Sequence, residues 1–294
     1  MPSPTIFDRS LLRARQQRAR ALGLETFLID RVAEELAERL AAVLRSFELA
    51  IDLGTPTGAV ARALAGKAAT IIRASHDAMR GEGLRVAADE EALPFADASL
   101  DLVVSALALQ FVNDLPGTLV QIRRALRPDG LLLAALVGGD SLNELRAAFA
   151  AAESEIEGGV SPHVAPFADL RELGALLQRA GFALPVIDSD RLTVRYQDVF
   201  ALMRDLRRMG ATNILRERRR APLKRATLAR MAEIYAGRFA DADGRLRATF
   251  EIVWLSGWAP HESQQKPLTP GAATQRLADA LGTKELPAGD KAGR

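Results

Sequence analysis

Ala50-Ile51-Asp52-Leu53-Gly54-Thr55-Pro56-Thr57-Gly58 is the stretch that decides the fold of this chain. An apolar run ends in an acidic residue, and a turn with two glycines then leads into a helical pattern. In α/β proteins, a strand, a tight turn and a helix start in this order present free backbone N–H groups to a nucleotide-like ligand. Pro56 stands where such turns usually carry a middle glycine. The stretch therefore predicts the fold more firmly than the ligand.

Strand-like and helix-like segments alternate around this stretch. Strands are expected at residues 47–53, 69–74, 84–87, 101–106, 131–137, 184–196 (with a break near 188–191) and 248–258. Helices are expected at residues 7–22, 27–44, 59–65, 115–126, 142–155, 167–180, 199–209 and 223–239. This alternation is typical of a doubly wound sheet. The prediction is an α/β, Rossmann-like fold with a mostly parallel seven-stranded sheet and a helical lid insertion.

The same pattern divides the chain into five parts. They are N-terminal helices (1–46), a Rossmann-like cofactor-binding core (47–196), a helical lid insertion (197–246), the last strand of the core (247–259) and a polar tail (260–294). Ligands of such sheets bind at the carboxyl ends of the strands. We therefore expect one crevice, lined by Gly54 to Gly58, Ser75 to Asp77, Asp89, Glu90 and Ser105.

Composition excludes several kinds of protein. The 294 residues are 48% apolar, and 39 Lys and Arg nearly balance 37 Asp and Glu, which argues against a general nucleic-acid binder. There is no cysteine, and the three histidines lack metal-ligand spacing, so no metal site is expected. No apolar run approaches the ~18 residues of a membrane span, and the first residues lack the apolar core of a secretory signal. The expected location is cytoplasmic.

Arginines cluster at two places, 13–20 and 216–220. Such clusters are most often solvated faces of helices or loops. The alternative is a docking surface for an acidic partner, or peripheral contact with an anionic membrane face.

Several segments are similar to one family of proteins. They are Ala88–Phe95, Asp101–Ser105, Val112–Pro116, Leu126–Gly130, Gly138–Leu142, Ser161–His163 and Ser256–Gln264. On these segments the chain resembles class I S-adenosylmethionine-dependent methyltransferases. Within them it is similar to the subfamily of biotin-pathway malonyl-carrier methyltransferases and the mitochondrial complex I assembly factor 5. The resemblance covers nearly the whole chain, and the segments at 138–142 and 256–264 are its most specific parts.

The resemblance implies S-adenosylmethionine as the cofactor, bound by Asp52, Gly54, Thr55, Gly58, Ser75, Asp77, Asp89, Glu90 and Ser105. Asp52 would meet the ammonium group of the cofactor, or it caps the turn through its own side chain. Asp89 would accept from the adenine amino group, or it is one surface acid among several. The implied partner is a subunit of the respiratory NADH dehydrogenase or an acyl carrier. In the mitochondrial branch, the implied activity is arginine hydroxylation during assembly of that enzyme.

The chain departs from the family pattern at three points. Pro56 removes an N–H group and fixes φ near −65° in the glycine turn. Ser75 stands where an acidic residue grips the ribose hydroxyls, and Gln110 and Phe111 replace a histidine and a tryptophan. No catalytic residue is predicted, because methyl transfer needs only alignment of the acceptor and exclusion of water. Arg195, Tyr196 and His261 are candidate substrate contacts, with a structural role as the alternative.

Three functions follow from these observations. The first is methyl transfer to a protein or carrier-bound substrate, with a role in NADH dehydrogenase assembly. The second is a catalytically degenerate assembly factor or chaperone, which the changes at Pro56, Ser75 and Gln110 favour. The third, by analogy with the biotin-pathway branch, is esterification of a malonyl-carrier thioester.

Overall fold

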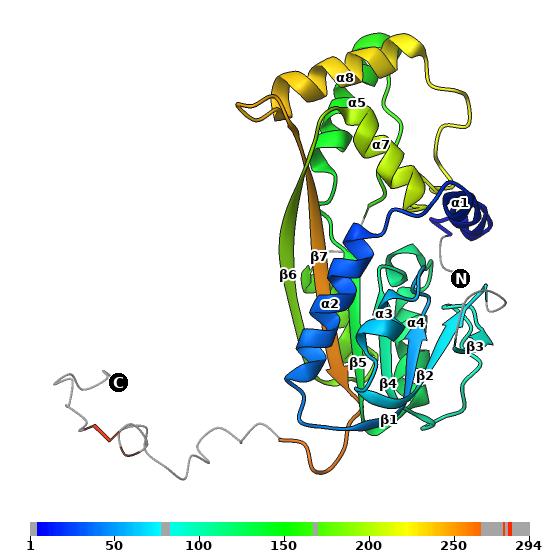
Figure 1. The fold of residues 1–294 in the computed structure, drawn as a ribbon, viewed down its shortest axis with the longest axis vertical. Helices are drawn as coiled ribbons and strands as arrows, with labels where there is room; N and C mark the ends of the chain where they lie inside the picture. Colours follow the sequence, from blue (N-terminus) through cyan, green and yellow to red (C-terminus); the bar gives the residue numbers. More distant parts are fainter. Residues whose placement is uncertain (1–4, 78–82, 167–169, 266–278, 280–281, 284–294) are drawn as a thin grey trace, which may run out of the picture. The chain divides into compact units, whose positions relative to one another are not determined.

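A single seven-stranded sheet organises the protein in this computed structural model (Figure 1). The strands are β1 (Phe47–Leu53), β2 (Ala68–Ser75), β3 (Leu84–Ala87), β4 (Leu100–Ala106), β5 (Leu126–Val137), β6 (Ala183–Tyr196) and β7 (Leu246–Trp258). Their order is β3-β2-β1-β4-β5-β7-β6, and only β7 runs antiparallel to its neighbours. The predicted Rossmann-like, mostly parallel sheet is therefore confirmed. The order reverses between β1 and β4, which places the first glycine turn at the switch point of the sheet.

The structure describes residues 5–77, 83–166, 170–265, 279 and 282–283. The chain separates into a unit of residues 1–260, which holds the sheet, and a second unit of residues 261–294. The start of the helix predicted at 167–180 lies outside the described residues. No helix among the described residues is long and apolar enough to cross a membrane.

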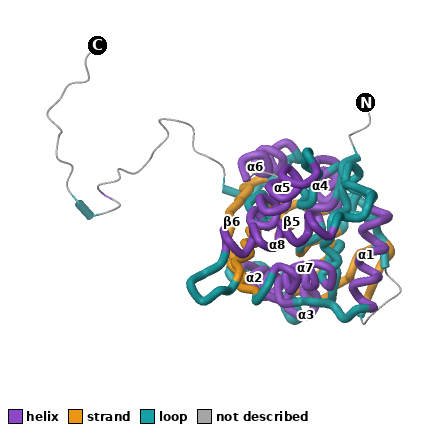
Figure 2. Tube along the Cα trace, turned by 90° about the horizontal axis from the view of Figure 1, so that it is seen from above, coloured by secondary structure: helices purple, strands orange, loops and turns teal. Residues whose placement is uncertain are grey.

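Helices cover both faces of the sheet (Figures 1 and 2). They are α1 (Arg9–Ala21), α2 (Phe27–Ala41), α3 (Ala59–Ala63), α4 (Leu115–Ala125), α5 (Asn143–Glu157), α6 (Leu170–Arg179), α7 (Val199–Arg208), α8 (Arg225–Phe239) and the short 3₁₀ helix η1 (Leu109–Phe111). Alternate residues of β5 show how the two apolar layers arise. Leu131 and Leu133 pack with α2, α5 and α7, whereas Leu132 and Ala134 pack with α4 and α6.

The expected break in the sixth strand is wrong. β6 pairs with β7 residue by residue from Ile187–Leu255 to Tyr196–Leu246, without interruption at 188–191. The polar side chains at 188–191 suggested a turn, but β6 is the edge strand of the sheet, where charged side chains reach water. Residues 126–130 are a second difference, because β5 already begins at Leu126 rather than at 131.

The two longest strands position the candidate site. β6 and β7 extend well beyond the parallel strands, and α5, α7 and α8 gather around that extension (Figure 1). α8 packs against α5, and α7 packs against α1. The helices α1 and α7 thereby lie over the end of the sheet where β1 and β4 finish.

Candidate functional site

Asp52 is a buried carboxylate at the end of β1. The residue is 2% exposed, and neither carboxylate oxygen has a hydrogen-bond partner in the described structure. The nearest charge is the guanidinium of Arg73, whose Nε lies 3.5 Å from Asp52 Oδ2. Burial raises the pKa of Asp52 to about 7. A buried carboxylate whose neighbouring cation lies as far away as 3.5 Å can take a cationic ligand group as a further partner.

Arg73 of β2 contacts the glycine turn that follows Asp52. Arg73 Nη2 donates to the carbonyl of Thr57 at 2.7 Å, across the proline that replaces the middle glycine. Gly54 has φ of +72°, and its N–H donates to the carbonyl of Ala74 at 2.8 Å. Gly58 stands at the N-cap of α3. The turn is therefore ordered by β2 on one side, in spite of Pro56.

Two of the predicted site residues, Ser105 and Thr55, form hydrogen bonds within the fold. Ser105 is fully buried, and its hydroxyl donates to the carbonyl of Leu53 at 2.8 Å. The hydroxyl of Thr55 accepts from the N–H of Ala106 at 3.2 Å. Both bonds tie β4 to the β1 turn at the switch point of the sheet. These contacts place both residues at the crevice and leave their part in ligand binding a prediction.

The structure brings the predicted acids together, and arginines of α1 hold them. Arg9 pairs with Asp89 and Glu90, and Arg20 Nη1 lies 2.5 Å from Asp77 Oδ2. Burial raises the pKa of Glu90, which is 7% exposed. Ser75 ends β2 beside this group, where its carbonyl accepts from the N–H of Ala88 at 3.1 Å.

α1 therefore covers the predicted crevice. A methyl group on Gly54 would lie only 2.7 Å from Glu90 Oε1, so the space over the glycine turn is filled by an acid that Arg9 holds. Two small cavities remain there, of about 20 and 80 Å³. The arginine cluster at 13–20 is thus partly used inside the molecule, since Arg13 also pairs with Asp89 at 2.7 Å.

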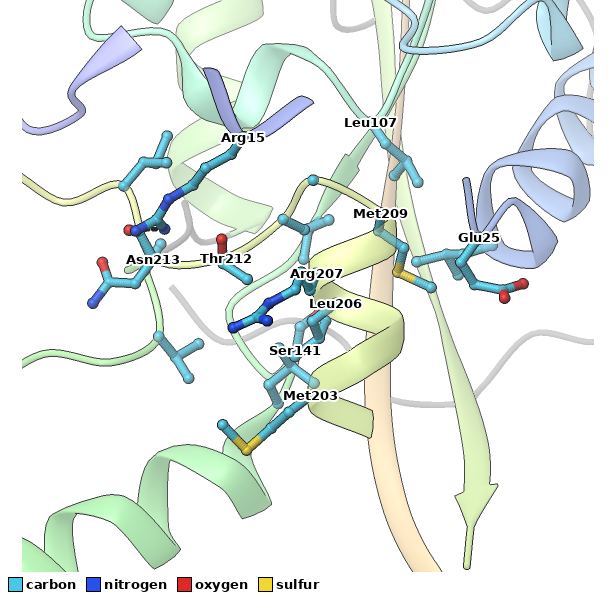
Figure 3. Close-up of a pocket in the computed structure, with 18 of the residues that line it drawn as sticks. Arg15, Glu25, Leu107, Ser141, Met203, Leu206, Arg207, Met209, Thr212 and Asn213 are labelled. Carbon is cyan, nitrogen blue, oxygen red and sulfur yellow. Dashed lines mark hydrogen bonds between the residues drawn. The ribbon is translucent and has the colours of Figure 1, made fainter. Parts of the chain in front are cut away.

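A much larger cavity of about 500 Å³ adjoins the glycine turn (Figure 3). Pro56 and Thr57 border it, together with Leu107 and Gln110 from the segment after β4. Most of its wall is apolar, with contributions from α2, α5 and α7. Apolar lining residues are Leu28, Ile29, Phe111, Leu142, Leu145, Phe149, Val164, Phe200, Met203, Leu206, Met209, Ile214 and Phe250.

Several polar side chains gather on one side of the cavity, and Glu25 lies on the opposite side (Figure 3). Figure 3 shows Arg15 of α1, Arg207 of α7, Thr212 and Asn213 around the same space. Arg15 donates to the carbonyl of Asn213, which fastens α1 to the segment after α7. Half of the predicted lid, α7, thus forms a wall of the cavity, whereas α8 packs on α5.

His163, for which the sequence predicts no role, lies in the cavity wall. His163 Nε2 is 2.8 Å from Glu153 Oε1 and 3.2 Å from Ser161 Oγ. The imidazole stacks on Phe149, with ring centroids 4.0 Å apart. Ser161–His163 was singled out as a family segment, but its acidic partner is on α5, and no sequence pattern joined the two.

The candidate substrate contacts on β6 do not line this cavity. Arg195 is paired with Asp241 and Asp243 at the far end of the strand, at 2.8 and 2.5 Å. Tyr196 is buried in the core. His261 belongs to the second unit, where its Nδ1 is 2.7 Å from Ser263 Oγ. Among the described residues no group of three metal-ligating side chains is found.

Comparison with known proteins finds similarity to methyltransferases and to their relatives. A methyltransferase-domain family model matches residues 51–134. The human mitochondrial arginine-hydroxylase NDUFAF5 is 40% identical over 281 residues, which cover 92% of this chain and 81% of that protein. The malonyl-[acyl-carrier protein] O-methyltransferase of Laribacter hongkongensis is 37% identical over 286 residues, which cover 90% of this chain and 94% of that protein.

A solved structure extends the likeness to the backbone. The YcgJ protein of Bacillus subtilis superposes with a TM-score of 0.52 at 14% identity, covering 77% of this chain and 98% of YcgJ. At that identity the likeness concerns the fold alone. The sequence relatives show that the chain belongs to the class I S-adenosylmethionine-dependent methyltransferase superfamily, in the family that includes NDUFAF5 and the malonyl-[acyl-carrier protein] O-methyltransferases.

Proposed function

We propose that this protein is an S-adenosylmethionine-dependent methyltransferase that acts on a group carried by a protein or an acyl carrier. The observation that carries the proposal is the apolar cavity of about 500 Å³ that opens directly beside Pro56 and Thr57 of the glycine turn. A cofactor held by the turn and an acceptor held in the cavity would meet at this border. A cavity of this size and lining suits one buried substrate group.

The residues around the turn fit the cationic part of the cofactor. When bound, S-adenosylmethionine supplies an electrophilic methyl group. Asp52 offers a buried carboxylate, 3.5 Å from Arg73 Nε, which would take the ammonium group of the amino acid part. Gly54 gives close access to the backbone because it has no side chain. Asp77, Asp89 and Glu90 would face the adenosyl part once α1 exposes them.

The protein itself would contribute to catalysis by aligning the methyl acceptor and by excluding water. Leu107 and Phe111 face the cavity next to the turn, and Gln110 Nε2 is held by the carbonyl of Leu107 at 2.9 Å. An apolar wall excludes water from the transfer and keeps the acceptor in one orientation. No acid or base is required at the methyl group itself.

The partner follows from the relatives rather than from the geometry. NDUFAF5 is named an arginine-hydroxylase of mitochondria, and the bacterial relative a methyltransferase of malonyl-[acyl-carrier protein]. The second name specifies a carrier-borne substrate, and the first specifies arginine, which we take to be a residue of a protein. We place the protein in assembly of the respiratory NADH dehydrogenase, as its resemblance to the assembly factor implies.

Calorimetric titration with S-adenosylhomocysteine tests the enzyme proposal. Binding that is lost in Asp52→Leu and kept in Asp188→Leu, on the solvent-facing edge strand, would support it. No heat at millimolar concentration would reject it. Methyl transfer from labelled S-adenosylmethionine to malonyl-acyl carrier protein, or to a purified NADH dehydrogenase subunit, then separates the two substrate branches.

A second function, an assembly factor without methyl chemistry, is favoured by one specific observation. Glu90 and Arg9 fill the space over Gly54, and Ser75 offers no carboxylate for the ribose. A deletion strain distinguishes the two. If Asp52→Leu protein restores NADH dehydrogenase assembly fully, the non-catalytic function holds; if it fails while remaining folded, the catalytic one does.

A further inference from the structure

The strongest unexplained feature of the cavity is the pair formed by Glu153 and His163. Glu153 is 1% exposed, although it is a carboxylate inside an apolar layer. Its oxygens accept from the N–H of Ser161 at 2.7 Å and from the hydroxyl of Ser161 at 2.8 Å, and they face His163 Nε2 at 2.8 Å. Burial of an unpaired carboxylate would cost much free energy of folding. The donors around Glu153 lower this cost, which indicates that its position is specific.

The geometry rules out a serine-nucleophile triad. In such a triad the imidazole uses one nitrogen for the acid and the other for the hydroxyl. Here both Glu153 and Ser161 approach the same nitrogen, Nε2. Ser161 also donates to Glu153, so its hydroxyl is part of the support for the acid rather than a nucleophile.

Because Glu153 and Ser161 both contact Nε2 of His163, neither of them contacts the other ring nitrogen, Nδ1. A carboxylate oxygen 2.8 Å from Nε2 favours a proton on that nitrogen, and in the neutral ring this leaves the lone pair on Nδ1. Within the described residues no hydrogen bond reaches Nδ1. The imidazole lies nearly parallel to the ring of Phe149, with an interplanar angle of 12°. His163 and Phe149 both line the cavity that begins at Pro56.

We propose that His163 is a substrate-binding residue, and that its Nδ1 accepts the hydrogen bond of an N–H or O–H group on the molecule that fills the cavity. The inference rests on the proposed function for the identity of that molecule as the methyl acceptor. It adds the chemical class of the ligand: an apolar body with an amine, guanidine or hydroxyl donor.

The same atom can hold a proton. If the bound N–H or O–H group gives up its proton, Nδ1 takes it, and the resulting imidazolium faces the carboxylate of Glu153. The imidazolium and the carboxylate would neutralise each other, with the guanidinium of Arg219 3.9 Å from Glu153 Oε1 as the next charge. A carboxylate acceptor has no proton to give at neutral pH, so it would make no use of this atom.

Two isosteric probes test the proposal without the natural substrate. Hexan-1-ol and 1-methoxypentane have the same heavy atoms, but only the alcohol can donate a hydrogen bond. The chain has three histidines, so their ring nitrogens can be followed separately in a ¹⁵N-labelled sample. We expect the Nε2–H tautomer for His163, a shift of its Nδ1 resonance with the alcohol only, and roughly three- to tenfold tighter binding of the alcohol.

Variants complete the test. His163→Phe keeps the stack on Phe149 and should abolish the difference between the probes, while His261→Phe, in the second unit, should preserve it. The proposal is overturned if both probes bind the wild type equally, if neither binds, if the difference survives in His163→Phe, or if the proton resides on Nδ1. Calorimetry of the wild-type protein with S-adenosylhomocysteine tests the methyltransferase proposal separately.

Discussion

Arg9 of the first helix is ion-paired with Glu90 of the loop after β3, and both side chains are largely buried, at 14% and 9% exposure. The pair lies over Gly54, in the space that opens above the glycine turn. Arg9 also reaches Asp89, so one guanidinium holds two acids that the sequence predicted as cofactor ligands. One contact that attaches α1 to the core therefore also closes the cofactor crevice.

Replacement of Arg9 by alanine should destabilise the fold strongly. Glu90 would keep its burial and lose its counter-charge, and breaking a buried ion pair from one side costs about 3–5 kcal/mol. Urea unfolding measures the loss. Arg18→Ala, which removes an exposed arginine of the same helix, should change the free energy of unfolding by less than about 0.5 kcal/mol. Equal effects of the two variants would contradict this prediction.

Replacement of Asp52 by asparagine should separate stability from binding. The pKa of Asp52 is about 7 in the folded protein, above its ordinary 3.8. Between these two pH values the folded carboxyl holds a proton that the unfolded one has lost, so stability falls as pH rises from 4 to 7, by up to about 4 kcal/mol. Asp52→Asn removes this loss.

The variant should therefore be more stable than the wild type at pH 8 and nearly equal to it at pH 4. At the same time it should bind S-adenosylhomocysteine less tightly, because the ammonium group loses an ionised partner. Thermal unfolding at the two pH values, with calorimetry at pH 8, checks both parts. A variant that is less stable at pH 8 would show that Arg73 compensates the buried charge.

Two glycines with the same backbone conformation isolate the steric role of the glycine turn. Gly54 has φ of +72° and Gly66 has φ of +83°, but only at Gly54 would a methyl group meet other atoms, at 2.7 Å from Glu90 Oε1. Gly66→Ala should cost about 1 kcal/mol through backbone strain. Gly54→Ala should cost clearly more and should also abolish binding of S-adenosylhomocysteine. Similar losses in both variants would mean that Glu90 moves away freely.

An acid at position 75 should strengthen the cofactor site. Ser75 ends β2 next to the crevice, where a carboxylate could take both ribose hydroxyls. A charge-assisted contact of this kind is worth about 1.5–3 kcal/mol, so Ser75→Asp should tighten S-adenosylhomocysteine binding by roughly ten- to a hundredfold. Ser75→Ala serves as the control and should stay within about twofold. Weaker binding in Ser75→Asp would show that α1 occupies the ribose position permanently.

Local patterns in the sequence were enough for most of the fold. β1 begins and ends where its apolar run predicted, because its second half is buried in the middle of the sheet. β3 also has its predicted bounds, although it is an edge strand with exposed ends. The pattern failed at β6, since an edge strand can carry charges such as Asp188 and Arg191 and still pair fully with β7.

The site was predicted less completely, for a physical reason. Asp52, Asp77 and Asp89 come to the crevice through the strand order alone. The partners of Asp77 and Asp89 on α1 could not be foreseen, because ion pairs between residues 57 and 80 positions apart leave no periodic signal. The pairing of Glu153 with His163 was missed for a related reason: it needs the loop after α5 to fold back onto the helix.

Gln16 lies where α1 borders both small cavities over the glycine turn and the large cavity beside it. Its Oε1 is buried without a partner, and its backbone packs against Gly210 after α7. A shift of this helix that admits one ligand must also remodel the wall that the other ligand touches. Cofactor and acceptor are therefore expected to bind with reciprocal cooperativity, each changing the affinity of the other by the same factor.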